Sequence, residues 1–179
     1  TLGRPTQVYL KPADALSALA PPEKPIAVRW PDAVHVDGGL VGGGRLGWPA
    51  GSDEGAVPRW LVFGAMIRLA FPRDVEPGLH PDSTALEEEG FADTSAARLA
   101  ESFARHFMIG ADAWQEDGFA SVAKDYISRL EREAGISPTL AANGDLLLWR
   151  GTMHVRQCSL AAALAQPSWL SSETGEPHL

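Results

Sequence analysis

The 179-residue sequence contains a single cysteine, Cys158. One thiol cannot form an internal disulfide, which fits a reducing compartment and excludes a zinc site built from several cysteines. Basic residues never form a tract longer than two, and the formal net charge is −8, so a nucleic-acid backbone would be repelled. No apolar run approaches the length of a membrane span, and the first residues do not resemble a signal peptide. We therefore expect a cytoplasmic protein that binds neither nucleic acid nor membrane.

Patterns typical of metal sites and of common nucleophiles are also missing. The five histidines have no acid or cysteine at a metal-ligand spacing, so no metal site is predicted. The Gly-x-Ser-x-Gly pattern of a nucleophile elbow does not occur. Gly42, Gly44 and Gly47 match Gly-x-Gly-x-x-Gly, but Trp48-Pro49 follows where a dinucleotide-binding fold needs a helix. We therefore discard the dinucleotide interpretation.

The bulk composition is that of an ordinary globular protein. Hydrophobic residues make up 45% and charged residues 21%, and the length suits one domain or one domain with a small appendage. The sequence opens at Thr1 with a strand-like stretch at residues 6–10, as the interior of a chain would. We expect it to lack an upstream segment.

Turn residues and apolar runs predict a β-hairpin followed by a further strand. Asp37-Gly38 lies between apolar stretches, which is a strong hairpin signal because both residues tolerate positive φ. Residues 33–36 should therefore pair with residues 40–46. After a loop at residues 47–58, the apolar run at residues 60–71 predicts a buried strand, with Gly64 marking a close backbone approach.

Helices are predicted next, and short strands after them. Asp93 or Thr94 should cap a long helix, and a second helix should run over about residues 120–133. Beyond Pro138, two turn signals separate short apolar stretches, as in a small antiparallel barrel or pair of hairpins. Strands and helices are segregated and do not alternate, which favours an α+β fold.

The order of several motifs resembles that of biotin protein ligases, in the wider biotin/lipoate protein ligase family. That family carries Lys-Trp-Pro-Asn-Asp at a strand end, a hairpin with Lys-x-x-Gly-Ile-Leu, and then a strand with Gly-Ile-Gly-Ile-Asn. The matching residues here are Arg29-Trp30-Pro31-Asp32-Ala33, Leu40-Val41-Gly42-Gly43-Gly44 and Gly64-Ala65-Met66-Ile67-Arg68. STALEEEG at residues 83–90, Gly118-Phe119 and NGDLLLWRG at residues 143–151 continue the likeness, which spans residues 26–160 in the same order.

The resemblance implies a fold, a division into domains and a chemistry. The fold would be the mixed sheet with packed helices of class II aminoacyl-tRNA synthetases and biotin ligases, plus a small SH3-like barrel. Residues 1–135 would form the ligase-like domain without its N-terminal part, residues 136–165 the barrel, and residues 166–179 a polar tail that frays. The family's chemistry is ATP- and Mg²⁺-dependent adenylation of biotin or a related acid, followed by transfer to a lysine of a carrier protein.

Several polar positions of the family pattern differ in this sequence. The Gly-Arg-Gly-Arg-x-x-Arg loop has no counterpart, and the hairpin lysine falls on Gly39 or Leu40. Asp32 replaces an asparagine, Ala33 an aspartate and Arg68 an asparagine. One preorganised charge-stabilising group is worth about 3 kcal/mol of barrier, so these changes predict little of the parent activity.

These considerations give a ligand site and leave three functions open. The predicted ligand-binding residues are Arg29, Trp30, Pro31, Asp32, Gly42, Gly43, Gly44 and Arg68. Glycines on the hairpin either make room for a flat ligand or another backbone, or form a flexible turn. The protein is then a biotin/lipoate ligase-like enzyme, a non-catalytic module that keeps a pocket for an acyl ligand or docks a carrier protein, or a scaffolding homodimer. No catalytic residue is assigned.

Overall fold

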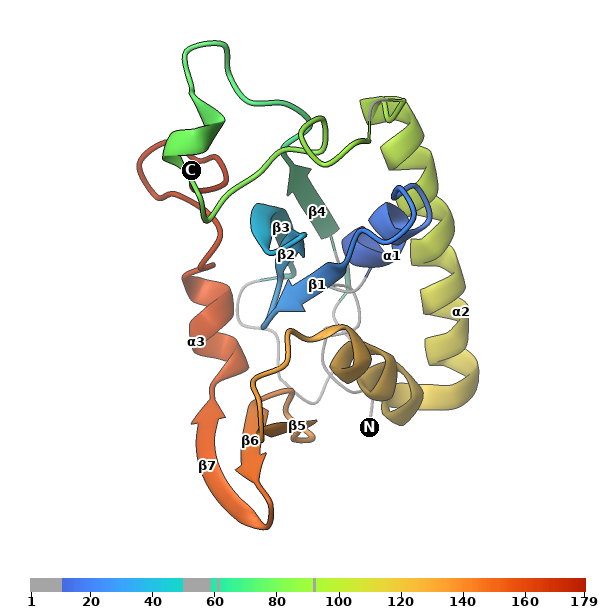
Figure 1. Ribbon diagram of the computed structural model, residues 1–179. Coiled ribbons are helices and arrows are strands. Elements are labelled where there is room, and N and C mark those ends of the chain that lie inside the picture. The colour runs from blue at the N-terminus through green and yellow to red at the C-terminus, as the bar shows by residue number, and fades with distance from the viewer. Residues whose placement is uncertain (1–10, 50–58, 61, 92) are drawn as a thin grey trace.

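Two antiparallel sheets and three helices make up the computed structural model, which describes residues 11–49, 59–60, 62–91 and 93–179 (Figure 1). The elements in chain order are α1 (Lys11–Ser17), β1 (Ile26–Arg29), β2 (Ala33–Val36), β3 (Gly39–Gly47), β4 (Val62–Ile67), the 3-10 turn η2 (Pro77–Leu79), α2 (Ala96–Arg129), β5 (Ser137–Leu140), β6 (Leu146–Arg150), β7 (Met153–Cys158) and α3 (Leu160–Ala165). The predicted strand at residues 6–10 and most of the predicted loop at residues 47–58 lie outside the described residues.

The larger sheet has the order β1-β2-β3-β4, and every neighbouring pair is antiparallel. The predicted hairpin is confirmed, since β2 pairs with β3 across a two-residue turn. In that turn Asp37 has a φ of 50° and Gly38 a φ of 86°, the left-handed values that select Asp-Gly. Among the described residues, parallel pairing occurs only as isolated bridges, so the mixed sheet implied by the resemblance is antiparallel in its ladders.

A bulge in the β2–β3 ladder decides which side chains of β3 face which way. The register shifts between Val34 and His35, opposite Gly42, whose φ is +148°. A Cβ on Gly42 would lie 1.9 Å from the carbonyl oxygen of Met66, so only glycine fits there. Beyond the bulge the alternation changes phase, and the backbone of Gly43 faces away from the helices.

The strand β4 corrects two expectations. It spans residues 62–67, shorter than the predicted 60–71, and it is mostly exposed at the edge of the sheet. A Cβ added to Gly64 would meet no described atom within 4 Å, so this glycine does not mark a close approach. An apolar run predicts a strand, but it does not say whether the strand lies in the centre or at the edge of its sheet.

The long helix α2 covers the first predicted helix and most of the second. Gly118, with φ 74° and ψ −169°, interrupts the helical geometry between them. The cap of the helix is Ser95, one residue after Thr94 and two after Asp93, the two predicted caps; its side chain accepts the backbone N–H of Arg98 at 3.2 Å. It ends at Arg129, before the predicted end at residue 133.

The smaller sheet has the order β5-β6-β7 and leads into α3. It is open among the described residues, so the closed SH3-like barrel is not confirmed. Asp145, which is buried, accepts the backbone N–H of Leu160 at 2.9 Å and the side-chain amide of Gln157 at 2.8 Å. This carboxylate therefore ties the start of α3 to the sheet before it.

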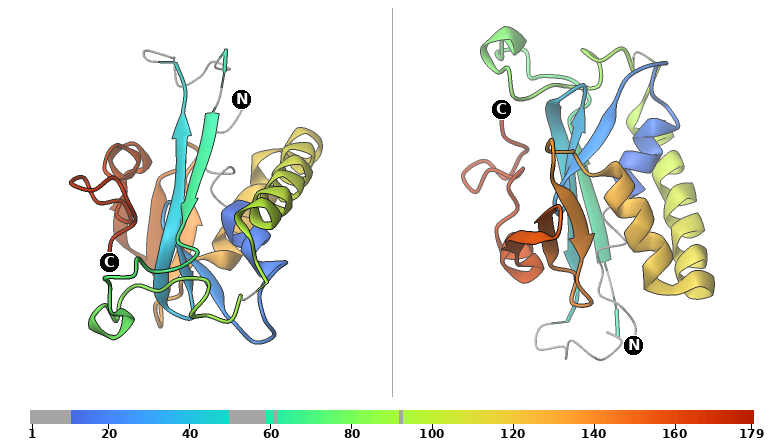
Figure 2. Two further views of the ribbon diagram at one scale, coloured as in Figure 1. Left: turned by 90° about the horizontal axis from the view of Figure 1, so that it is seen from above. Right: turned by 60° about the horizontal axis from the view of Figure 1, so that its bottom comes forward.

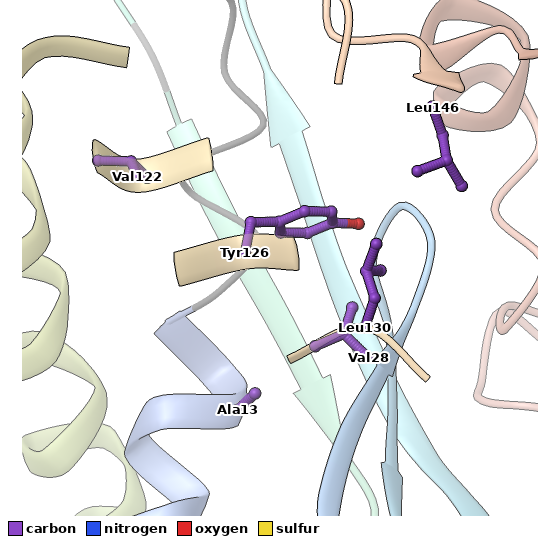
Figure 3. Close-up of a cluster of buried hydrophobic side chains, with 6 residues drawn as sticks. All are labelled: Ala13, Val28, Val122, Tyr126, Leu130 and Leu146. Atoms are coloured by element: carbon purple, nitrogen blue, oxygen red, sulfur yellow. The ribbon is translucent and has the colours of Figure 1, made fainter. Parts of the chain in front are cut away.

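The two faces of the larger sheet are covered by different parts of the chain. The helices α1 and α2 lie on one face, and the last residues of the chain lie against the other (Figure 2). Tyr126 of α2 extends into the core between α1 and β1, beside Val28 and Leu130 (Figure 3). Leu146 of β6 completes this cluster and joins the smaller sheet to it. No described helix has both the length and the apolar character that crossing a bilayer would require.

Candidate functional site

The corner between β1 and β2 consists of Trp30, Pro31 and Asp32, and it contains a cis peptide bond between the first two. The hydroxyl of Tyr126 donates a hydrogen bond of 2.9 Å to the Pro31 carbonyl oxygen, inside the core. The indole Nε1 of Trp30 is buried and has no hydrogen-bond partner among the described residues. Helix α2 therefore holds the corner in place through the Tyr126 hydroxyl, while the Trp30 indole N–H remains a donor without a partner among the described residues.

This corner lies directly against the glycines of β3. The backbone N–H of Gly44 donates to the carbonyl oxygen of Asp32 at 3.1 Å. A Cβ on Gly43 would lie 2.6 Å from the same oxygen. The predicted Trp-Pro corner and glycine strand are thus neighbours. The glycines pair within strand β3 and do not form a flexible turn, so the flexible-turn interpretation is wrong.

Asp32 is the most unusual group of the corner, because its side chain is a buried acid. The residue is 1% exposed, and no donor among the described residues meets hydrogen-bond geometry at either carboxyl oxygen. Burial raises the pKa of the carboxyl from 3.8 to about 6, while the Trp169 indole and the positive charge of Arg45 oppose the rise. Trp169 is therefore close enough to lower the pKa of Asp32, although its indole N–H does not reach hydrogen-bond geometry with the carboxyl.

Trp169 belongs to the C-terminal segment (Pro167–Leu179), which lies on the sheet face opposite the helices (Figure 2). It is 1% exposed and packs in a cluster with Ala33 and Leu40. A Cβ on Gly43 would lie 2.4 Å from its Nε1 and 2.5 Å from its Cε2, so the indole lies over the bare backbone of this glycine. Residues 166–179 were expected to be a polar tail that frays; in the structure the indole packs instead against the candidate site.

Arg68, which follows β4, holds the other end of the C-terminal segment. Its Nη2 donates to the carbonyl oxygens of Pro177 and His178, both at 2.8 Å. Its Nη1 donates to the Thr84 carbonyl oxygen at 3.2 Å and, at 3.5 Å, to that of Leu40. Desolvation lowers the pKa of the guanidinium from its usual value. The cation is thus used to bind main-chain oxygens.

Arg29 turns toward a different region of the molecule. It forms a two-pronged ion pair with Glu131, in which Nη2 lies 3.2 Å from Oε1, and this pair raises the pKa of Arg29. A cavity of about 210 Å³ opens beside the pair, between β1 and the smaller sheet. Its lining includes Arg29, Trp30, Leu130, Glu131, Arg132, Glu133, Leu148, Arg156 and Cys158. None of the glycines of β3 lines it.

The structure thus divides the predicted site residues into two groups. Asp32, Gly43 and Arg68 lie beneath the C-terminal segment, with Gly44 bonded to Asp32. Arg29 and Trp30 line the cavity, Pro31 supplies an acceptor to the core, and Gly42 forms the bulge. A single cavity enclosing the corner and the glycine strand, as the motif order suggests, is not what these contacts form.

Sequence reasoning missed Trp169, Glu131 and Tyr126. The one available signal was Trp169 itself, a large aromatic residue in an otherwise polar stretch at residues 166–179. Because a tryptophan in such a stretch usually needs a place to bury its ring, it was reason to expect docking. The ion pair of Arg29 with Glu131 joins residues 102 positions apart, and no spacing rule predicts it.

The flat indole of Trp169 covers the candidate site, and the cations near the corner are largely committed to other contacts. On the sheet face opposite α1 and α2, the indole of Trp169 lies over Gly43, and both carboxyl oxygens of Asp32 lack a hydrogen bond among the described residues. Of the arginines near the corner, Arg29 is paired, Arg68 binds carbonyl oxygens and Arg45 is exposed. In the part of the chain that the structure describes, no group of three histidine, cysteine, aspartate or glutamate side chains is arranged to hold a metal ion.

Comparison with known proteins gives a family match over more than half of the chain. The profile of the biotin/lipoate A/B protein ligase family matches residues 8–128. A search of curated proteins found no match.

Similar solved structures include both a relative of unknown function and known ligases. A biotin protein ligase-like protein of unknown function from Silicibacter sp. TM1040 has a TM-score of 0.67 and 29% identity, over 90% of this chain and 72% of that one. The apo biotin protein ligase of Aquifex aeolicus gives 0.62 and 16%, over 86% and 70%. The same ligase in complex with biotin and ATP gives 0.59 and 13%, over 84% and 66%. At these lower identities the likeness to the Aquifex ligase shows the fold alone.

Proposed function

Because the chain belongs to the biotin/lipoate A/B protein ligase family, we propose that it binds a small carboxylic acid of the biotin or lipoate class. The ligand lies on the sheet face opposite the helices, at Asp32 and Gly43. The observation that supports the proposal is the aromatic ring of Trp169 over Gly43, because it fills a place on this surface that a ring of similar size would fit. The Aquifex ligase that shares the fold binds biotin and ATP.

The electrostatics of the site favour binding without efficient activation of the acid. Adenylation brings a carboxylate and a triphosphate together, and fixed cations must offset their charge. Here the position of the family's hairpin lysine is taken by Gly39, whose Cβ position is filled by Thr84, or by Leu40, which packs on Trp169. Asp32 adds an acid at the same place. A binding module is therefore the better-supported function.

One observation favours a second candidate, ATP-dependent activation of the bound acid. The cavity beside Trp30 carries three arginines, Arg29, Arg132 and Arg156, against two glutamates, Glu131 and Glu133. Its positive balance suits a phosphate group, and Arg29 becomes available if Glu131 turns away. In this second proposal the acid and the nucleotide bind on the two sides of the corner.

Thermal unfolding with candidate ligands tests the binding proposal. Biotin and lipoate are each titrated against the full chain, with the methyl ester of the same acid as the matched control that lacks the carboxylate. Ligand at about 100 times its Kd should stabilise the protein by about 2.7 kcal/mol. An ester that stabilises the protein equally would show that the carboxylate is not recognised. If neither acid shifts the unfolding temperature at any concentration, the small-acid function is wrong.

Release of pyrophosphate separates the two candidates. The full chain is incubated with ATP, Mg²⁺ and the acid that binds, and released pyrophosphate is followed over time. A binding module releases none above the level seen without the acid. Acid-dependent release would establish the second candidate, and replacing Arg156 by glutamine should then reduce it about 100-fold, as loss of a charge-stabilising donor does elsewhere.

A further inference from the structure

We propose that the indole of Trp169 occupies the place of the ligand's ring, and that the C-terminal segment (Pro167–Leu179) must leave before a ligand binds. The ligand class that fits is a flat ring that bears an N–H donor and presents it to Asp32. This inference rests on the proposed function, because it names the part of the ligand that the same site recognises.

The surface around Gly43 has the shape of a planar ring. The place where Gly43 would carry a side chain is filled by an indole nitrogen and carbon at 2.4 and 2.5 Å from the ideal Cβ position. Because Gly43 has no side chain, its backbone leaves a flat surface, and the side chains of Ala33 and Leu40 pack around the indole. A planar ring of similar size would make the same contacts once the indole has left.

The polar groups of Trp169 and Asp32 are poorly paired with each other. Both oxygens of Asp32 and the Nε1 of Trp169 are buried without a hydrogen bond among the described residues. Buried polar groups of native proteins are nearly always paired, so a carboxyl and an indole N–H that lie close together without hydrogen-bond geometry make an imperfect polar contact. A ring with N–H groups placed to meet the carboxyl oxygens would satisfy atoms that Trp169 leaves unpaired.

The C-terminal segment makes few polar contacts with the sheet among the described residues. Within the segment, the N–H of His178 bonds to the Trp169 carbonyl oxygen and that of Ser171 to the Glu176 carbonyl oxygen, both at 2.9 Å. Its polar attachment to the sheet runs through the two carbonyl oxygens bound by Arg68. The segment is thus a small folded loop with its own hydrogen bonds, fastened at an aromatic ring and at one guanidinium. Such a loop can detach as a unit while the sheet stays folded.

Hydrogen exchange of the full chain without ligand tests the detachment. The amide of His178 reports the loop, and the amide of Gly44, which bonds to Asp32 beneath it, is the matched reference on the sheet. Detachment predicts an opening constant for His178 at least about 100-fold larger than for Gly44. Equal opening constants would show that the loop unfolds only with the whole protein and would overturn the inference.

The second test uses biotin, whose ring carries two N–H groups, against lipoate, whose ring carries none. Binding of biotin should speed exchange at His178, because the two compete for one place, and Asp32→Asn should weaken biotin more than lipoate. Trp169→Ala should raise the apparent affinity for biotin about tenfold or more, since the closed form no longer competes. The control Trp60→Ala, an exposed tryptophan, should leave the affinity unchanged.

Each outcome decides one of the two proposals. Biotin that binds without speeding exchange at His178, or that binds Trp169→Ala no more tightly, overturns the displacement. If biotin and lipoate bind neither the wild type nor Trp169→Ala, the small-acid function fails, and exchange without ligand alone decides whether the loop detaches. Should Trp169→Ala fail to fold, the wild-type exchange measurements carry the test by themselves.

Discussion

Replacing Asp32 by asparagine should change how the stability of the protein depends on pH. The carboxyl is 1% exposed, and its pKa is raised from 3.8 to about 6, chiefly by burial. A raised pKa means that the folded protein keeps a proton that the unfolded chain has already lost between about pH 4 and pH 6. The free energy of unfolding therefore falls as the pH rises through this window.

The size of the effect follows from the shift. About two pKa units at roughly 1.4 kcal/mol each correspond to about 3 kcal/mol. The asparagine variant lacks the titration, so the difference in stability between variant and wild type should grow by about 2.5 kcal/mol from pH 4 to pH 7, the rest of the effect lying below pH 4. Any cost of burying the amide does not depend on pH and cancels from this comparison.

Urea denaturation at several pH values measures the difference directly. The variant Asp74→Asn serves as the control, because it removes the same charge from an exposed loop. The free energies are compared as variant minus wild type, so that titration of the rest of the protein drops out. A flat difference between pH 4 and pH 7 would show that Asp32 is solvated or paired in solution, and the argument from its burial would be refuted.

Three further substitutions test the contacts around the site, each by urea denaturation. Gly43→Ala should destabilise the protein by about 1–3 kcal/mol, because its Cβ would overlap Trp169; an unchanged midpoint would contradict that packing. Tyr126→Phe leaves the carbonyl oxygen of Pro31 without its donor and should cost about 1–3 kcal/mol, whereas a neutral effect would deny the hydrogen bond. Gly38→Ala should cost about 1 kcal/mol because its φ is +86°, and a stabilised variant would argue against the turn.

The parts of the fold that follow from short-range signals could be predicted from the sequence. The turn at Asp37-Gly38 fixed the hairpin, because positive φ at two successive residues is a local requirement. The helix break at Gly118 likewise left a local mark. The exposure of β4 left none, since burial of a strand depends on what packs over it from elsewhere in the chain.

The candidate site shows the same division between local and distant causes. The Trp-Pro corner and the glycine strand are separated by the single strand β2 and could be placed together from motif order. Their occupancy by Trp169, and the pairing of Arg29 with Glu131, depend on contacts across more than a hundred residues. No periodicity or spacing carries that information, and only the three-dimensional arrangement reveals it.

The hydrogen bonds of Arg68 to the carbonyl oxygens of Pro177 and His178 have a consequence for variation in the sequence. Main-chain oxygens are present whatever the side chains are, so substitutions at positions 178 and 179 should leave both hydrogen bonds in place. Trp169, in contrast, is recognised through its ring. Natural variants are therefore expected to tolerate many residues after position 177, while position 169 should accept few besides large aromatic ones.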